Sequence, residues 1–62
     1  MDRLIRLPEL EKTVGLRRSA LYKRISEGRF PAPVRLDGRA VAWKASDVEK
    51  WIGDLPPREA RP

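Results

Sequence analysis

Apolar residues recur at helical spacing near the start of the chain. Leu10 and Val14 lie one turn apart, and Pro8 suits the first position of a helix, where its missing N–H would have no intrahelical partner. Gly15 follows, and glycine commonly ends helices because it tolerates left-handed geometry. The pattern predicts a first helix over residues 8–14.

A second helical pattern begins a few residues later. Leu21 and Ile25 lie one turn apart and predict the core-facing side of a helix that begins at Arg17 or Arg18 and ends at about Glu27. The opposite arc would face outward and consists of Ser19, Tyr22, Lys23 and Ser26. Two short helices joined by a glycine-containing turn predict a helix-turn-helix.

The next segment changes from helical to extended. Pro31 and Pro33 exclude a helix and favour extended geometry in the residues before them. Hydrophobic and polar residues then alternate on both sides of Asp37-Gly38, a dipeptide typical of type I′ turns. The segment therefore predicts a β-hairpin with these two residues at its turn.

The position of the turn sets the expected register of the two strands. Leu36 would pair with Arg39, and Val34 would pair with Val41. In this register Val34, Val41 and Trp43 share the core side of the hairpin.

A third helix is predicted by the pattern after the hairpin. Ser46 and Glu49 have the S-x-x-E spacing of a capping box at a helix start. Val48, Trp51 and Ile52 follow with helical spacing and predict a buried stripe.

The predicted order is helix, turn, helix, β-hairpin, helix. This order indicates a mainly α fold with a β-hairpin wing, a small winged helix-turn-helix, over residues 1–53. Residues 54–62 hold three prolines and four charges, so we expect a disordered C-terminal tail. A chain of 62 residues allows one domain with a small core.

The positive charge is concentrated in the middle of the chain. The formal net charge is +5, and residues 17–44 carry eight basic residues and two acidic ones. The flanking segments are close to neutral. A basic block inside a patterned region predicts a positive surface suited to an anionic partner such as DNA.

The composition excludes several function classes. Because the chain has no cysteine and no histidine, disulfides and thiolate or imidazole metal sites are excluded. No carboxylates are paired for acid–base chemistry, so we expect no enzyme activity and no metal or cofactor. No apolar run is long enough to span a membrane or to act as a secretion signal, which favours a cytoplasmic protein.

The candidate DNA-binding residues fall into two groups. In the second helix they are Arg17, Arg18, Ser19, Tyr22 and Lys23. Ser19 and Lys23 have reach and chemistry for base edges, whereas Arg18 and Tyr22 suit phosphates. In the wing and its flanks they are Arg29, Arg35, Arg39 and Lys44. The alternatives are a solvated helix face and edge-strand charges that oppose aggregation.

The aromatic residues are expected in the core. Trp43 and Trp51 could stack on unpaired bases, as in proteins that bind single strands. Both lie in phase with apolar neighbours, however, and a small domain needs large side chains in its core. We expect the same of Phe30. Buried tryptophans also count against an RNA-binding function.

Three motifs in this order resemble the AlpA family of prophage regulatory proteins, relatives of MerR-type winged helices and phage excisionases. They are GLRRSALYK at residues 15–23, EGRFP at residues 27–31 and GRAVAW at residues 38–43. The resemblance covers about residues 6–52.

The resemblance implies a double-stranded DNA-binding regulator of a prophage or integrative element. Members regulate transcription, often of an integrase gene, or act as excisionases, which makes integrase a candidate partner. The second helix would enter the major groove and the wing would touch the backbone. By position this implies roles for Arg18, Ser19, Tyr22, Lys23 and Arg39.

The sequence departs from the family pattern at two positions. Arg17 stands where members often have Ser or Thr as the helix N-cap, and Asp37 stands where the wing turn often has a small neutral residue. MerR-type proteins dimerise through a long C-terminal helix that is not predicted here. We therefore expect a monomer that assembles cooperatively on DNA. The alternative function is a phage-type interaction module whose basic face binds a host protein.

Overall fold

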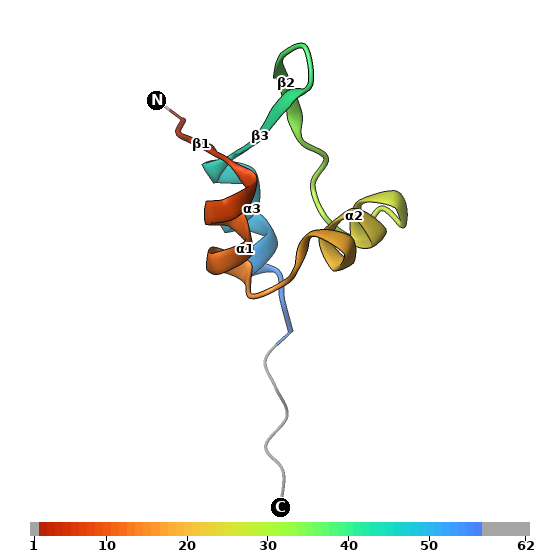
Figure 1. Cartoon of the computed structure of the whole chain (residues 1–62). Helices are drawn as coiled ribbons and strands as arrows, with labels where there is room; N and C mark the ends of the chain where they lie inside the picture. The colour runs from red at the N-terminus through yellow and green to blue at the C-terminus, as the bar shows by residue number, and fades with distance from the viewer. Residues whose placement is uncertain (1, 57–62) are drawn as a thin grey trace, which may run out of the picture.

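The computed structural model describes residues 2–56 (Figure 1). In chain order its elements are β1 (Leu4–Ile5), α1 (Leu7–Val14), α2 (Arg18–Ser26), β2 (Val34–Asp37), β3 (Ala40–Lys44) and α3 (Ala45–Gly53). The predicted mainly α fold with a β-hairpin wing is confirmed. Of the tail predicted over residues 54–62, residues 57–62 lie outside the described residues.

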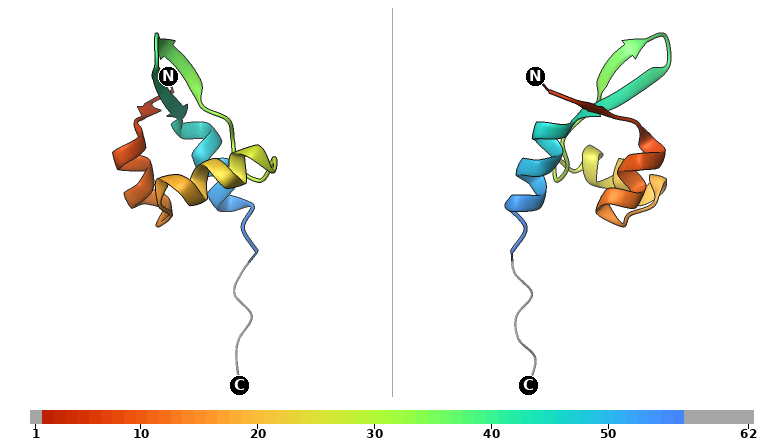
Figure 2. Two further views of the ribbon diagram at one scale, coloured as in Figure 1. Left: turned by 45° about the vertical axis from the view of Figure 1, so that its right-hand side comes forward. Right: turned by 90° about the vertical axis from the view of Figure 1, so that its left-hand side faces the viewer.

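Glycines end the two helices of the helix-turn-helix as predicted. Gly15 has a left-handed φ of 73°, and its N–H donates to the Glu11 carbonyl in the last turn of α1. Gly28 has the same φ and donates to the Ile25 carbonyl at 3.0 Å. In the left view of Figure 2, α2 crosses the front of the molecule, and the hairpin projects away from the helices.

The pattern of the sequence did not predict β1. This strand pairs antiparallel with β3, with Leu4 opposite Lys44 and Ile5 opposite Trp43, and gives a three-stranded sheet in the order β1-β3-β2. Two residues are too short to show an alternating pattern. The strand nevertheless places Ile5, which is 4% exposed, in the core.

The hairpin turn lies one residue later than predicted. Asp37 pairs with Ala40, so that Gly38 and Arg39 form the turn. Gly38 has a φ of 52°, but no residue other than glycine in the described chain has a positive φ. A type I′ turn needs positive φ at both central residues, so the predicted turn type is wrong.

The predicted strand register is also wrong. Val34 pairs with Ala42, and Arg35 pairs with Val41, because a bulge in β2 shifts the pairing. Residues directly opposite each other share a face of the sheet. Val34 is therefore not on the same face as Val41 and Trp43, and the three residues do not share the core side.

Six buried side chains form the hydrophobic core: Ile5, Leu10, Leu21, Phe30, Trp43 and Val48. Trp43 is fully buried, and its indole N–H donates to the Pro31 carbonyl at 3.0 Å. Trp51 is half-buried, lies edge-on to Phe30 at 4.7 Å, and donates to the Arg29 carbonyl at 2.9 Å. The predicted placement of these aromatic residues in or against the core is confirmed.

One residue of the predicted stripe on α3 is exposed. Val48 is 1% exposed, whereas Ile52 is 42% exposed. Ile52 lies one turn further along, at the end of α3, where Trp51 already fills the contact with Phe30. The buried stripe of α3 is therefore shorter than predicted.

The start of α3 is capped by the N-terminal segment, so the predicted Ser46–Glu49 capping box is wrong. The helix begins at Ala45, which places Ser46 inside the first turn. The Ser46 hydroxyl donates to Asp2 Oδ2 at 2.6 Å, and the Ser46 N–H donates to Asp2 Oδ1 at 3.1 Å. The Ala45 N–H donates to the Arg3 carbonyl at 2.7 Å.

Candidate nucleic-acid interface

The exposed face of α2 presents Ser19 and Lys23 to solvent. These residues lie four positions apart, about 6 Å along the helix axis, on the side opposite the buried Leu21. Ser26 is on the same side, but its hydroxyl donates to the Lys23 carbonyl at 2.7 Å. Within the described chain, Ser19 and Lys23 are therefore the side chains of this face with uncommitted donors.

Tyr22 is half-buried, so the prediction that it lies on the fully outward-facing arc is wrong. Its ring meets Trp43 edge-on, with the centroids 6.3 Å apart, and packs against the core. The Arg18 guanidinium lies 5.8 Å from the centre of the same ring. This contact holds Arg18 and Tyr22 together at the edge of the exposed face.

The first turn of α2 has no side-chain cap among the described residues. Arg17 occupies the cap position in extended geometry, with φ −83° and ψ 166°, and makes no capping hydrogen bond. The first turn also contains no acidic residue. The N–H groups of this turn and the nearby guanidinium groups are consequently well placed to meet an anion.

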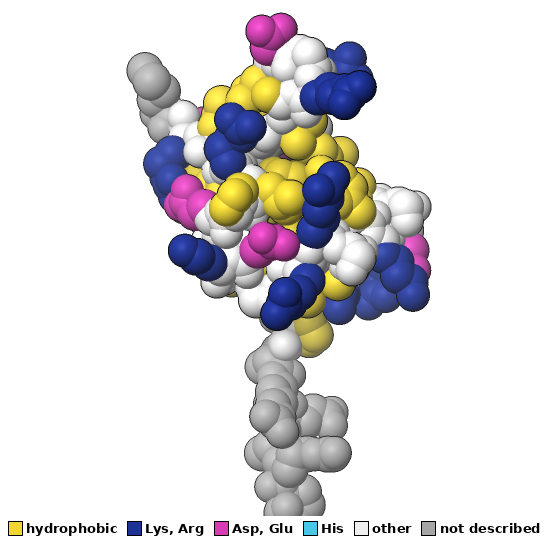
Figure 3. All heavy atoms as spheres, in the orientation of Figure 1, with side chains coloured by type: hydrophobic (Ala, Val, Ile, Leu, Met, Phe, Trp, Pro, Cys, Tyr) yellow, Lys and Arg dark blue, Asp and Glu magenta, His cyan; other side chains and the backbone are white. Residues whose placement is uncertain are grey.

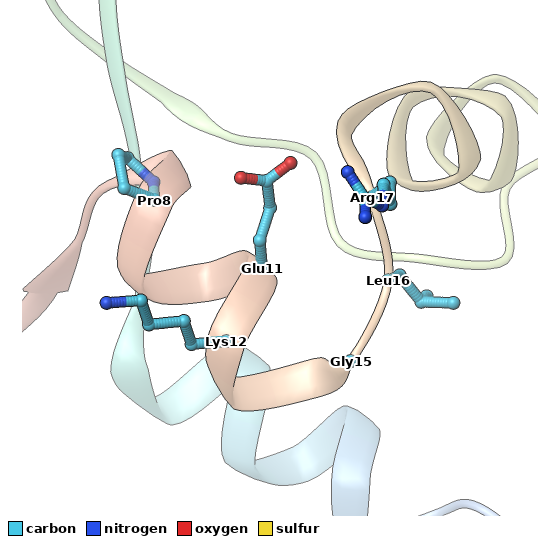
Figure 4. A pocket seen from close by; sticks show the side chains of 6 residues that line it. All are labelled: Pro8, Glu11, Lys12, Gly15, Leu16 and Arg17. Carbon is cyan, nitrogen blue, oxygen red and sulfur yellow. The ribbon is translucent and has the colours of Figure 1, made fainter.

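Two adjoining open grooves lie between α1 and the start of α2. One, of about 540 Å³, is lined by Glu11, Arg17, Arg18, Ser19 and Tyr22. The other, of about 430 Å³, is lined by Pro8, Glu11, Lys12, Gly15, Leu16 and Arg17 and is drawn in Figure 4. Four of the five residues that the sequence predicted in the second helix therefore line one groove. The fifth, Lys23, lies one turn after Ser19 on the exposed face of α2.

The wing carries Arg35 and Arg39, both of which are exposed. Arg35 lies in β2 opposite Val41, and Arg39 lies in the turn. The tip also carries Asp37, and Figure 3 shows basic and acidic side chains together at the end of the hairpin. Neither arginine has a salt-bridge partner in the described part of the protein.

The structure places Lys44 away from these two groups, whereas Arg29 lines a shallow pocket together with Lys23 of α2. Arg29 lies after α2 and is within 3.6 Å of Glu27. Lys44 is the last residue of β3 and lies opposite Leu4 of β1. It is five residues after Arg39, about 16 Å in an extended strand. There its charge helps to lower the pKa of Asp2. Neither residue is tested as a DNA contact, and both stay predictions.

The shifted pKa values belong to the opposite side of the molecule. Hydrogen bonds from Ser46 hold the pKa of Asp2 below its ordinary value. Arg3 bonds to Glu9 at 3.0 Å and holds the pKa of that carboxyl below its ordinary value. These charges are paired within the chain, whereas no basic side chain of α2 has a salt-bridge partner among residues 2–56.

Sequence reasoning missed Glu11, which lines both grooves. The residue as a whole is half-buried, and its carboxylate forms no salt bridge among the described residues. The sequence did offer a signal: Glu11 is an acidic residue one helical turn before Gly15, and the basic residues begin just after that glycine.

Residues 2–56 contain no group of three or more metal-ligating acidic side chains, and none of the helices there is both long and apolar enough to cross a membrane.

The sequence was compared with known proteins. Residues 3–55 match the family described as "Prophage CP4-57 regulatory protein (AlpA)". "Uncharacterized protein ORF88" of Enterobacteria phage P4 is 43% identical over 51 residues, which cover 82% of this chain and 58% of that relative. No solved structure matches. The family match spans most of the chain, and the chain belongs to the AlpA family of prophage regulatory proteins.

Proposed function

We propose that this prophage regulatory protein binds double-stranded DNA through α2 and the hairpin wing. The observation that carries the proposal is the concentration of uncommitted basic and hydroxyl side chains on α2. They are exposed on a helix whose first turn is uncapped, beside a groove. Phosphates and base edges offer the acceptors that these donors lack.

The proposed binding mode places α2 in the major groove. A helix fits this groove, which is about 12 Å wide. Ser19 and Lys23 point away from the core and would meet base edges. Arg17, Arg18 and Tyr22 lie at the start and the flank of the helix and would donate to phosphates. The packing of Tyr22 on Trp43 fixes its position before DNA binds.

The hairpin wing would contact the flanking backbone. Arg39 lies in the turn and Arg35 in β2, so both are carried on an element that projects from the helices (Figure 2). Asp37 at the tip would repel phosphate, so the wing would lie on the backbone without inserting its turn deeply into the minor groove. Arg29 and Lys44 would make at most peripheral contacts.

The regulatory role would be transcriptional control, excision of the element, or both. Promoter occupancy and DNA bending use the same contacts, and integrase is a candidate partner in either case. A single small module buries little surface on DNA, so useful specificity requires repeated sites. We propose a monomer in solution that assembles cooperatively on such sites. Non-cooperative titration of a duplex with several sites would contradict this assembly.

The test is fluorescence anisotropy on duplexes that tile the attachment site and integrase promoter of the encoding element. Random competitor DNA is added in excess, at two salt concentrations. We expect binding to a few tiles, with a slope of log K against log salt of about −0.9 per phosphate neutralised. Lys23→Ala should abolish the preference among tiles.

Lys50→Ala is the matched control, because Lys50 is exposed on α3 and its loss removes the same charge. It should leave the preference among tiles intact. Equal, weak, salt-sensitive binding of the wild type to every tile would contradict the proposal. That result would favour the alternative, in which the basic face binds an acidic host protein.

A further inference from the structure

Glu11 is an acidic residue on a surface that is otherwise basic. It projects from α1, yet the groove that it lines is completed by four residues at the start of α2: Arg17, Arg18, Ser19 and Tyr22. In Figure 4 its carboxylate points into the space between α1 and the start of α2, with Arg17 on the other side. A DNA that meets α2 would therefore also meet this carboxylate.

The Glu11 carboxylate differs from its neighbours because it has no ion-pair partner within the described structure. Glu9 on the same helix is bonded to Arg3 at 3.0 Å, and Glu27 is within 3.6 Å of Arg29. Glu11 has no cation within 4.0 Å and accepts no side-chain hydrogen bond in the described structure. Two guanidinium groups line its groove, and yet neither is paired with it.

A carboxylate at a DNA interface restricts what can approach it. Phosphate is repelled, and the base-edge acceptors of guanine and thymine are repelled as well. The base amino groups in the major groove are donors, and the N4 amino group of cytosine is the usual partner of Glu. Glu11 is half-buried as a residue, and a DNA lying over its groove would displace water there, which would strengthen such a bond.

We propose that Glu11 is a specificity-determining residue that accepts a hydrogen bond from a cytosine amino group in the major groove. The inference rests on the proposed function, because it places α2 in that groove. Among the α2 residues that line this groove, Ser19 is the one assigned to a base edge, so Glu11 would face the base pair next to that of Ser19. The guanidinium groups of Arg17 and Arg18 would hold the phosphates beside it and offset the repulsion from the carboxylate. One cytosine in the target would thus be recognised by α1 and not by α2.

The experiment first selects a preferred duplex from a random library with the wild-type protein. Each base pair is then replaced in turn, and affinities are measured for the wild type and for Glu11→Gln. We expect one C·G pair whose replacement by T·A weakens wild-type binding about tenfold, within the range of one base-edge contact. In Glu11→Gln the same replacement should matter less than twofold, or the preference should move to adenine.

Glu9→Gln is the matched control, because it removes the same charge from the same helix. It should retain the wild-type preference at every position. If Glu11→Gln changes the affinity for all duplexes by one common factor, Glu11 acts through Arg17 or through net charge, and the inference is wrong. A wild-type protein that selects no duplex at all contradicts the proposed function itself, which is a separate outcome.

A second measurement needs no protein variant. The selected cytosine is replaced by 2-pyrimidinone, which lacks the amino group, and the same replacement at a neighbouring cytosine corrects for the weakened base pair. About tenfold weaker binding at the selected position alone supports the inference. Equal effects at the two positions overturn it, whether or not Glu11→Gln folds.

Discussion

The two sides of this small domain use their polar groups in different ways. On the side of β1 and α3, Asp2 bonds to Ser46 and Arg3 bonds to Glu9, so donors and acceptors are matched within the chain. On the side of α2, the basic side chains of the helix form no salt bridge with the described residues, and the helix start is uncapped. The first side pairs its polar groups within the chain, and the second side leaves its donors without such pairs.

The largest effect should come from the residue that joins the two sides. Trp43→Ala removes the largest fully buried side chain, together with its hydrogen bond to Pro31 and its contact with Tyr22. Such truncations cost about 3–5 kcal/mol, which is most of the stability that a domain of this size has. We expect loss of the cooperative thermal transition in circular dichroism. Ile52→Ala, on an exposed side chain, should leave the transition in place.

A smaller effect should show that an arginine of the wing and an arginine near β1 contribute differently to DNA binding. Arg39→Ala and Arg3→Ala each remove one guanidinium, from the wing and from the Arg3–Glu9 pair respectively. Arg39→Ala should weaken DNA binding several-fold and reduce the salt slope by about 0.9, because one phosphate contact is lost. Arg3→Ala should leave that slope unchanged. Equal slopes for the two variants in anisotropy titrations would show that the charges are not divided in this way.

Ser46→Ala tests the matched side alone. The variant loses the hydroxyl that donates to Asp2 but retains the backbone N–H that donates to the same carboxylate. The free energy of unfolding should fall slightly, because one exposed hydrogen bond is lost while the backbone bond to the same carboxylate remains. Urea denaturation measures this loss. Affinity for DNA should stay within twofold of the wild type. A larger change would show that the contact between Asp2 and Ser46 also influences the DNA-binding side.

The smallest effect should appear as a dependence of stability on pH. The pKa values of Asp2 and Glu9 are held below their ordinary values of 3.8 and 4.5. The unfolded chain therefore binds more protons in this range, and the folded state loses stability as the pH falls below about 4. Melting temperatures between pH 7 and pH 3 should show this loss. Asp2→Asn should make the loss smaller, and an unchanged profile would contradict this assignment.

Local signals in the sequence predicted much of the fold. Gly15 and Gly28 marked the ends of α1 and α2, and the apolar spacing identified Leu21 and Val48 as core residues. These features depend on residues within one or two turns of each other. Trp43 was predicted in the core for the same reason.

The features that sequence reasoning missed depend on residues far apart in the chain. The S-x-x-E spacing at Ser46 indicated a local cap, but the acceptor is Asp2, which no local pattern connects to it. The hairpin register is a local exception, because it changed when the turn moved one residue later and a bulge added one residue to β2. Tyr22 lies on the polar arc by spacing, but the position of Trp43 decides its burial.

The same difference between local features and features that join distant residues applies to the candidate site. The residues of α2 were predicted because they share one helix with a clear polar face. Glu11 was missed because the groove that it lines exists only when α1 packs against the start of α2. Sequence patterns thus identify the polar face of α2 more readily than the side chain that faces it from another element.

The contact between Asp2 and Ser46 has a consequence for the order of folding. It joins residues 44 positions apart, so it forms only after most of the chain has been ordered. Until then α3 lacks the acceptor for its first turn and, with nine residues, is too short to persist alone. The last helix of the domain therefore becomes stable together with the first strand, which makes the two ends of the described chain a single cooperative unit.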